Sequence, residues 1–227
     1  MNGFVITFHI MYGEPIILAS ESPRRSSILE SLHIPFQKIV PSIDESIFDH
    51  LEPGERVTAL AATKARRGKT LWLEKQENTR QNEIQDERPS ATPRLVLGAD
   101  TLVAFQTQGG WITIGKPANE RDAFDMLSME AGKRHTVFSG LCLLDMTRDQ
   151  PYVALSVSEV QFSPMTNEDI AWYLSFGEWR GAAGAYRIQG VGSYFIEEIK
   201  GSSSSVMGLP IRELYGILRE SGYFASP

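Results

Sequence analysis

The sequence is organised around one apolar segment, Leu95-Val96-Leu97-Gly98-Ala99-Asp100-Thr101-Leu102-Val103. Its length and apolar composition are typical of a buried β-strand, yet a carboxylate lies near its middle. Burying an aspartate without a partner costs several kcal/mol, so a strand that continues past Asp100 requires a cation, a metal ion or a catalytic role for that residue. The alternative is that the strand ends at Ala99 and that Asp100 caps a turn.

The segments around this stretch alternate between strand and helix patterns. We expect strands at 15–19, 35–40, 95–105, 111–114, 135–145, 152–162 and 195–199, with a bulge where the apolar alternation changes phase after Val157. Helices are expected at 23–32, 54–72, 166–174 and 210–220, and a further one begins after Asn119. Alternating strands and helices predict an α/β fold with a mixed β-sheet flanked by helices.

No internal repeat or strong domain boundary interrupts the chain, which predicts a single domain over 1–227 with its core at about 15–222. Residues 74–94 are rich in Glu, Gln, Asn, Arg and Pro, and we interpret them as an exposed polar insertion between a helix and the central strand. The sequence assigns no function to this insertion.

Composition excludes several classes of protein. The net charge of -6 argues against broad binding to nucleic acid or to an anionic membrane surface. No apolar run approaches the roughly 20 residues that a membrane span needs, and the first residues lack the features of a signal peptide. The single cysteine, Cys142, lies in an apolar run and is predicted to be a small buried hydrophobe. These observations predict a cytoplasmic protein.

The turn after the first strand is a candidate phosphate site. Ser20 lies in a serine-rich loop, Ser22 is a suitable N-cap, and Arg24 and Arg25 follow in the first helical turn. Free backbone N–H groups and two arginines attract phosphate, although cations at a helix N-terminus oppose the helix dipole unless an anion is bound. The alternative is a pair of solvated arginines.

Other charged and polar residues form a second group of candidates. Asp44 and Glu45 are either ligands of a hard cation or solvated loop residues. Lys64 shares the inward stripe of its helix, where it either reaches the solvent edge or points into a cleft. Lys116 follows a strand end, and Gln189 lies in a glycine-rich loop where its amide could contact a base edge, unless that loop is only a surface connection.

Five motifs occur in one order along the chain: Leu18-Ala19-Ser20-Glu21-Ser22-Pro23-Arg24-Arg25, Gly98-Ala99-Asp100-Thr101, Gly115-Lys116-Pro117, Ala183-Gly184-Ala185-Tyr186 with Ile188-Gln189-Gly190, and Gly208-Leu209-Pro210. Together they resemble the Maf family of nucleoside triphosphate pyrophosphatases over about Pro15 to Gly222. The resemblance implies an elongated mixed β-sheet flanked by helices, with two lobes and a central cleft, as in the inosine triphosphate pyrophosphatases. It also implies hydrolysis of a nucleoside triphosphate to the monophosphate and pyrophosphate.

The resemblance assigns roles residue by residue. It implies that Asp100 is the catalytic proton acceptor or a metal ligand, and that Glu45 helps to hold a divalent cation, Mg2+ or Mn2+. Substrate binding is implied for Ser20, Arg24, Arg25, Lys64, Thr101, Lys116 and Gln189. Ala-Asp-Thr and Ile-Gln-Gly resemble the dTTP/UTP branch rather than the 7-methyl-GTP branch. The family also suggests a homodimer.

The chain departs from the family pattern at four positions. Ala182 stands where a lysine is common, Arg187 where a glycine is common, Ser203 where an aromatic residue is common, and Thr63 where a glutamate is common. We expect these changes to alter rate or selectivity, and the cation missing at Ala182 to weaken triphosphate binding. Two alternatives stay open: a nucleotide-binding regulator of cell division without turnover, and the same enzyme acting on another nucleotide such as 7-methyl-GTP.

Overall fold

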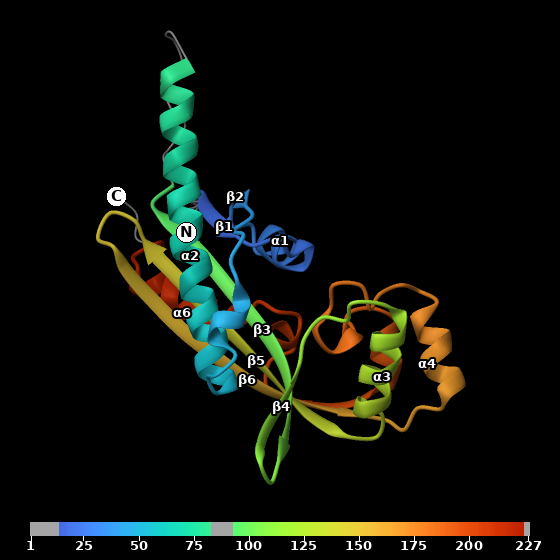
Figure 1. The fold of residues 1–227 in the computed structure, drawn as a ribbon. Helices are drawn as coiled ribbons and strands as arrows, with labels where there is room; N and C mark the ends of the chain where they lie inside the picture. Colours follow the sequence, from blue (N-terminus) through green and yellow to red (C-terminus); the bar gives the residue numbers. More distant parts are fainter. Residues whose placement is uncertain (1–13, 83–92, 225–227) are drawn as a thin grey trace, which may run out of the picture.

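The described part of the chain folds around one mixed β-sheet. The computed structural model describes residues 14–82 and 93–224 (Figure 1). These residues form a seven-stranded sheet in the order β2-β1-β3-β5-β6-β7, with β4 paired to β3. The strands are β1 (Ile16–Ala19), β2 (Phe36–Ile39), β3 (Leu95–Thr107), β4 (Gly110–Ile114), β5 (Arg134–Asp145), β6 (Gln150–Phe162) and β7 (Ile196–Lys200). β1 is parallel to β2 and β3, and the other pairs are antiparallel. The α/β fold class is confirmed.

The helices cover the sheet in two groups, which lie toward opposite ends of the molecule in Figure 1. One group contains α1 (Pro23–Ser31), α2 (Pro53–Asn82) and α6 (Ile211–Glu220), and the other contains α3 (Glu120–Glu130) and α4 (Asn167–Leu174). Short helical turns complete the chain: η1 (Glu45–Phe48), η2 (Ala183–Ala185), η3 (Val191–Phe195) and α5 (Ser203–Val206). Each group packs its own apolar core against the sheet, giving two lobes joined by the long strands β3, β5 and β6.

The alternation of β3 decides which side of the sheet carries Asp100. Leu95, Leu97 and Ala99 pack with α1 and α6, whereas Val96 packs with α2 on the opposite face. Because side chains alternate along a strand, the side chain of Asp100 lies on the same face as Val96 and points toward α2. β3 continues to Thr107, so the alternative in which the strand ends at Ala99 is wrong.

Two glycines allow α2 to lie directly on this face. A Cβ atom added at Gly98 would overlap the backbone of Ala61, and one added at Gly140 would overlap the backbone of Val57. The helix therefore approaches β3 and β5 more closely than side chains would permit. This approach brings Lys64, one turn beyond Ala61, over Asp100.

The expected end of α2 near Trp72 is wrong, because the helix continues to Asn82. The polar residues 74–79 thus form an exposed helical extension rather than an irregular loop, and glutamate, lysine and glutamine are good helix formers. The rest of the predicted insertion lies partly outside the described residues, which resume at Pro93 near the start of β3.

An irregularity does occur in β6, but it lies at Gln161 and Phe162, beyond the change of apolar phase after Val157. β5 and β6 pair without interruption, and the irregularity lies where β6 meets β7. Val153, Leu155 and Val157 face outward, whereas Ser156 and Ser158 are buried. Ser158 is buried because Ser202 covers it and exchanges hydrogen bonds with its hydroxyl.

The local helix signals are mostly confirmed. Asn119 accepts a hydrogen bond from the backbone of Asp122, and Thr166 forms a reciprocal capping box with Asp169. Ser22 precedes α1 as predicted but makes no side-chain capping bond; its backbone N–H donates to Ser20 Oγ instead. No helix in the described part of the chain is long and apolar enough to cross a bilayer.

Candidate active site

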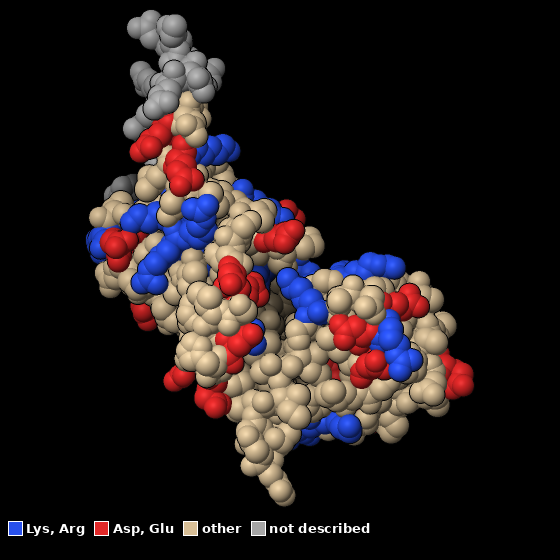
Figure 2. All heavy atoms as spheres, viewed as in Figure 1, with Lys and Arg blue, Asp and Glu red and all other residues tan. Residues whose placement is uncertain are grey.

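A cavity of about 990 Å³ lies between the two lobes. Its walls come from α1, η1, α2, the centre of β3, the segment after β4 and the 180–189 segment. Figure 2 shows the corresponding hollow, with acidic and basic side chains at its rim. Its lining includes Arg24, Arg25, Glu45, Lys64, Asp100, Thr101, Lys116, Arg187 and Gln189.

Asp100 belongs to a three-charge cluster with Lys64 at its centre. Lys64 Nζ lies 2.6 Å from Asp100 Oδ1 and 2.6 Å from Glu45 Oε1. Asp100 and Lys64 are 8% and 9% exposed, so the lysine does not reach the solvent edge but points into the cavity. The interpretation of Lys64 as a cleft residue is confirmed, and its ammonium supplies the partner that a buried Asp100 requires.

The charges around Glu45 hold it in its ionised form. Burial would raise the pKa of its carboxyl, but the hydrogen bond from Lys64 and the charges of Lys64, Lys116 and Arg25 outweigh burial and lower that pKa. Asp44, the neighbouring candidate ligand, caps η1 through Ser46 instead and does not line the cavity. Of these two adjacent carboxylates, only Glu45 therefore lines the cavity.

Arg25 fixes the cavity floor rather than extending into solvent. Its guanidinium donates to Gly208 O at 2.8 Å, to Ser20 Oγ at 3.0 Å and to Thr101 Oγ1 at 3.3 Å. Burial lowers the pKa of Arg25, while the charges of Asp100 and Glu45 act in the opposite direction. Ser20 itself is buried and absent from the cavity lining, so the structure gives it a supporting contact to Arg25.

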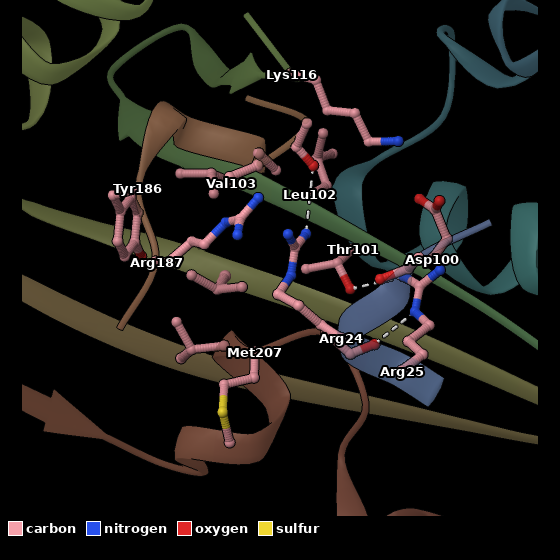
Figure 3. A pocket seen from close by; sticks show the side chains of 18 of the residues that line it. Arg24, Arg25, Asp100, Thr101, Leu102, Val103, Lys116, Tyr186, Arg187 and Met207 are labelled. Atoms are coloured by element: carbon pink, nitrogen blue, oxygen red, sulfur yellow. Dashed lines mark hydrogen bonds between the residues drawn. The ribbon is translucent and has the colours of Figure 1, made fainter. Parts of the chain in front are cut away.

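The remaining predicted residues surround the open part of the cavity. Thr101 lies beside Asp100 and contacts Ser139 Oγ at 3.0 Å, in addition to Arg25. Arg24 donates to Gly181 O at 3.3 Å, while Lys116 and Gln189 are exposed residues of the lining. Figure 3 shows Lys116, Arg24 and Asp100 around the same space. Every predicted site residue except Ser20 and Asp44 thus lines one cavity.

Several residues of the cavity were not predicted. Arg187, identified from the sequence only as a departure, extends into it (Figure 3), and Arg56 pairs with Asp49 at another part of the lining. Nothing in the local sequence marks Arg187 as a cavity residue, because its direction depends on the fold of the glycine-rich segment. The chain thus lacks the common lysine at Ala182 but carries Arg187 in the same cavity.

The glycine-rich segment rests on a buried polar group. Tyr186 lines the cavity, and its hydroxyl lies 2.8 Å from His135 Nε2. Burial lowers the pKa of His135 to about 4. The fully buried Glu130 has no hydrogen-bond partner among the described residues, and burial raises the pKa of its carboxyl. Gly184 has φ +71°, and any side chain there would collide with the Glu130 carboxyl.

The donor set fits a divalent cation only if the substrate completes the coordination. The carboxylates of Glu45 and Asp100 converge on one positive charge, the Lys64 ammonium. In the part of the chain that the structure describes, no group of three or more His, Cys, Asp or Glu gathers to hold a metal. Mg2+ commonly uses one or two carboxylates together with substrate phosphates and water, which is compatible with these two residues.

The fold and the cavity define an α/β protein whose interlobe site combines a lysine-paired carboxylate with several cations. The chain belongs to the Maf family, described as Maf-like protein, whose sequence pattern matches residues 15–221. It is 40% identical over 213 residues to a dTTP/UTP pyrophosphatase of Treponema denticola, an alignment that covers 92% of this chain and 97% of that protein.

Other relatives carry the same name. A dTTP/UTP pyrophosphatase of Desulforamulus reducens is 38% identical over 208 residues, with 92% of this chain and 97% of that protein aligned. One from Clostridium acetobutylicum is 38% identical over 208 residues, with 91% and 98% aligned. The predicted family membership is confirmed.

Proposed function

We propose that this chain is a nucleoside triphosphate pyrophosphatase that hydrolyses dTTP and UTP. The observation that carries the proposal is the Asp100 carboxylate, 8% exposed in the middle of a strand, facing a cavity of about 990 Å³. The names of the relatives support the choice of dTTP and UTP. The cations of the cavity supply a local attraction for a polyphosphate that the net charge of -6 does not.

In the proposed reaction, water adds to phosphorus and the α–β phosphoanhydride bond breaks. The nucleoside monophosphate and pyrophosphate leave, and Asp100 accepts the proton of the water as the new P–O bond forms. Lys64 keeps the Asp100 carboxylate oriented through its 2.6 Å contact. Arg25 fixes Thr101 next to it and contributes positive charge near the phosphates.

A divalent cation, Mg2+ or Mn2+, is part of this proposal. Glu45 and Asp100 would hold it together with phosphate oxygens of the substrate. When bound, it would offset the negative charge that develops on those oxygens. Glu45 and Asp100 would then contact both the Lys64 ammonium and the divalent cation.

The base is proposed to lie toward the 186–189 segment. Tyr186, Val103 and Met207 give this end of the cavity apolar surface (Figure 3). Gln189 offers one amide donor and one amide acceptor for the edge of a pyrimidine. Thr101 lies between this end and Asp100 (Figure 3), where it could influence which nucleotide is positioned for reaction.

The test is pyrophosphate release from dTTP, UTP, CTP, GTP and 7-methyl-GTP, with Mg2+, Mn2+ or a chelator. We expect release from dTTP and UTP that requires a divalent cation. Release centred on another base would retain the chemistry but contradict the proposed specificity. Nucleotide binding without release from any substrate would instead favour the regulator.

A further inference from the structure

Two arginines from distant parts of the chain meet in the cavity. Arg24 comes from the first turn of α1, and Arg187 comes from the segment after η2. They are anchored to adjacent carbonyls: Arg24 Nη2 donates to Gly181 O at 3.3 Å, and Arg187 Nη2 donates to Arg180 O at 2.9 Å. Figure 3 shows both guanidinium groups directed into the same space.

These two guanidiniums differ from those cations of the cavity that have a carboxylate partner. Lys64 and Arg56 each form ion pairs with carboxylates, whereas neither Arg24 nor Arg187 has a carboxylate partner among the described residues. The Nε of Arg187 is buried and has no hydrogen-bond partner there. Burial, followed by the charges of Arg187 and Arg25, lowers the pKa of Arg24 to about 10. The arrangement is therefore electrostatically unfavourable until an anion joins it.

We infer that Arg187 binds the phosphate chain of the substrate together with Arg24. This inference rests on the proposed function and extends it to a residue that the motifs do not assign. Guanidinium groups present several donors in one plane, and a phosphate offers matching oxygens with the opposite charge. A neutral base edge would leave both positive charges uncompensated. The ligand class is thus a phosphate oxyanion, from either a nucleotide or free polyphosphate.

The experiment compares Arg187→Gln, Arg187→Lys and the control Arg121→Gln, which removes an exposed arginine outside the cavity. Calorimetry measures binding of inorganic tripolyphosphate and, separately, of thymidine. We expect Arg187→Gln to weaken tripolyphosphate binding about tenfold or more, to raise the KM for dTTP similarly and to leave thymidine binding unchanged. Arg187→Lys should retain part of the tripolyphosphate affinity, and the control should match the parent.

Direct binding separates this inference from the proposed function. If no nucleotide releases pyrophosphate but Arg187→Gln still weakens tripolyphosphate binding, the anion site stands and the enzymatic proposal fails. If release is normal and tripolyphosphate binds parent and Arg187→Gln equally, the phosphate role of Arg187 is overturned. A selective loss of thymidine binding would also overturn it and would assign Arg187 to the base. Thermal unfolding of each variant, with Arg187→Lys as the less disruptive change, excludes misfolding as the cause.

Discussion

The two sides of the cavity differ in whether their charged side chains have partners of opposite charge. On the α2 side, Lys64 bridges Glu45 and Asp100, so each charge has an opposite partner before any ligand arrives. On the opposite side, Arg24 and Arg187 donate to carbonyl oxygens and have no carboxylate partner among the described residues. Paired charges keep a catalytic carboxylate in place, whereas unpaired charges create affinity for an incoming anion. Whether a charge already has an opposite partner, rather than its residue type, thus distinguishes the proposed catalytic side from the proposed binding side.

The largest effect is expected from Asp100→Asn. The amide cannot accept the proton of the attacking water, so pyrophosphate release should fall by about 100-fold or more. Pyrophosphate release and equilibrium binding of dTTP, measured on the same preparation, check this. Binding should remain or become tighter because one negative charge near the phosphates is gone. Undiminished release by the variant would remove Asp100 from the mechanism.

Lys64→Met tests the paired side of the comparison. Loss of the ammonium leaves Asp100 and Glu45 as like charges, so we expect about 100-fold slower pyrophosphate release. The free energy of unfolding should fall by about 1–3 kcal/mol, less than for a fully buried pair because Glu45 is half exposed. Urea unfolding measures this change.

Lys69→Met is the matched control for Lys64→Met. It also breaks a lysine–carboxylate contact on α2, but its partner Asp149 is largely exposed. We expect this variant to lose less than about 1 kcal/mol. Equal effects of the two substitutions on stability and rate would contradict a special role for the Lys64 cluster.

Acid should reduce the stability that His135 contributes beneath the glycine-rich segment. His135 has a pKa of about 4 in the folded protein, whereas an unfolded chain has a value near 6.5. Between these values only the unfolded state gains the proton, so the contribution of His135 to the free energy of unfolding should fall by about 2 kcal/mol from pH 7 to pH 5. His135→Gln should remove that part of the decline, measured by urea unfolding at both pH values. His50 is exposed, so His50→Gln serves as a control. An unchanged fall in the free energy of unfolding from pH 7 to pH 5 in His135→Gln would refute this account.

The smallest effect is expected from Gln189→Glu. The carboxylate lacks the N–H donor of the amide, so the ratio of kcat/KM for UTP to that for GTP should fall about tenfold. Gln150→Glu, which adds the same charge outside the cavity, should leave the ratio unchanged. An unaltered ratio in Gln189→Glu would show that base selection lies elsewhere, for example at Thr101.

Much of the local structure was predictable because its causes are local. A continuous apolar run predicted β3, and side-chain caps predicted the starts of α3 and α4. The motifs placed Asp100 and Gln189 among the site candidates, and the inward stripe of its helix placed Lys64 there. The end of α2 was not predictable from apolar periodicity, because the exposed extension continues through helix propensity without an apolar stripe. The burial of Ser158 in β6 was missed because its hydrogen bonds with Ser202, in a distant segment, make that burial favourable.

From the sequence alone it follows that a carboxylate interrupts an apolar strand and that lysines and arginines stand in the motifs before and after it. Which of these charges meet is set by the fold. Gly98 and Gly140 permit the close helix contact that brings Lys64 to Asp100, and the fold of the glycine-rich segment turns Arg187 toward Arg24. These pairings join residues far apart in the chain, and Coulomb interactions depend on their distance in space rather than in sequence.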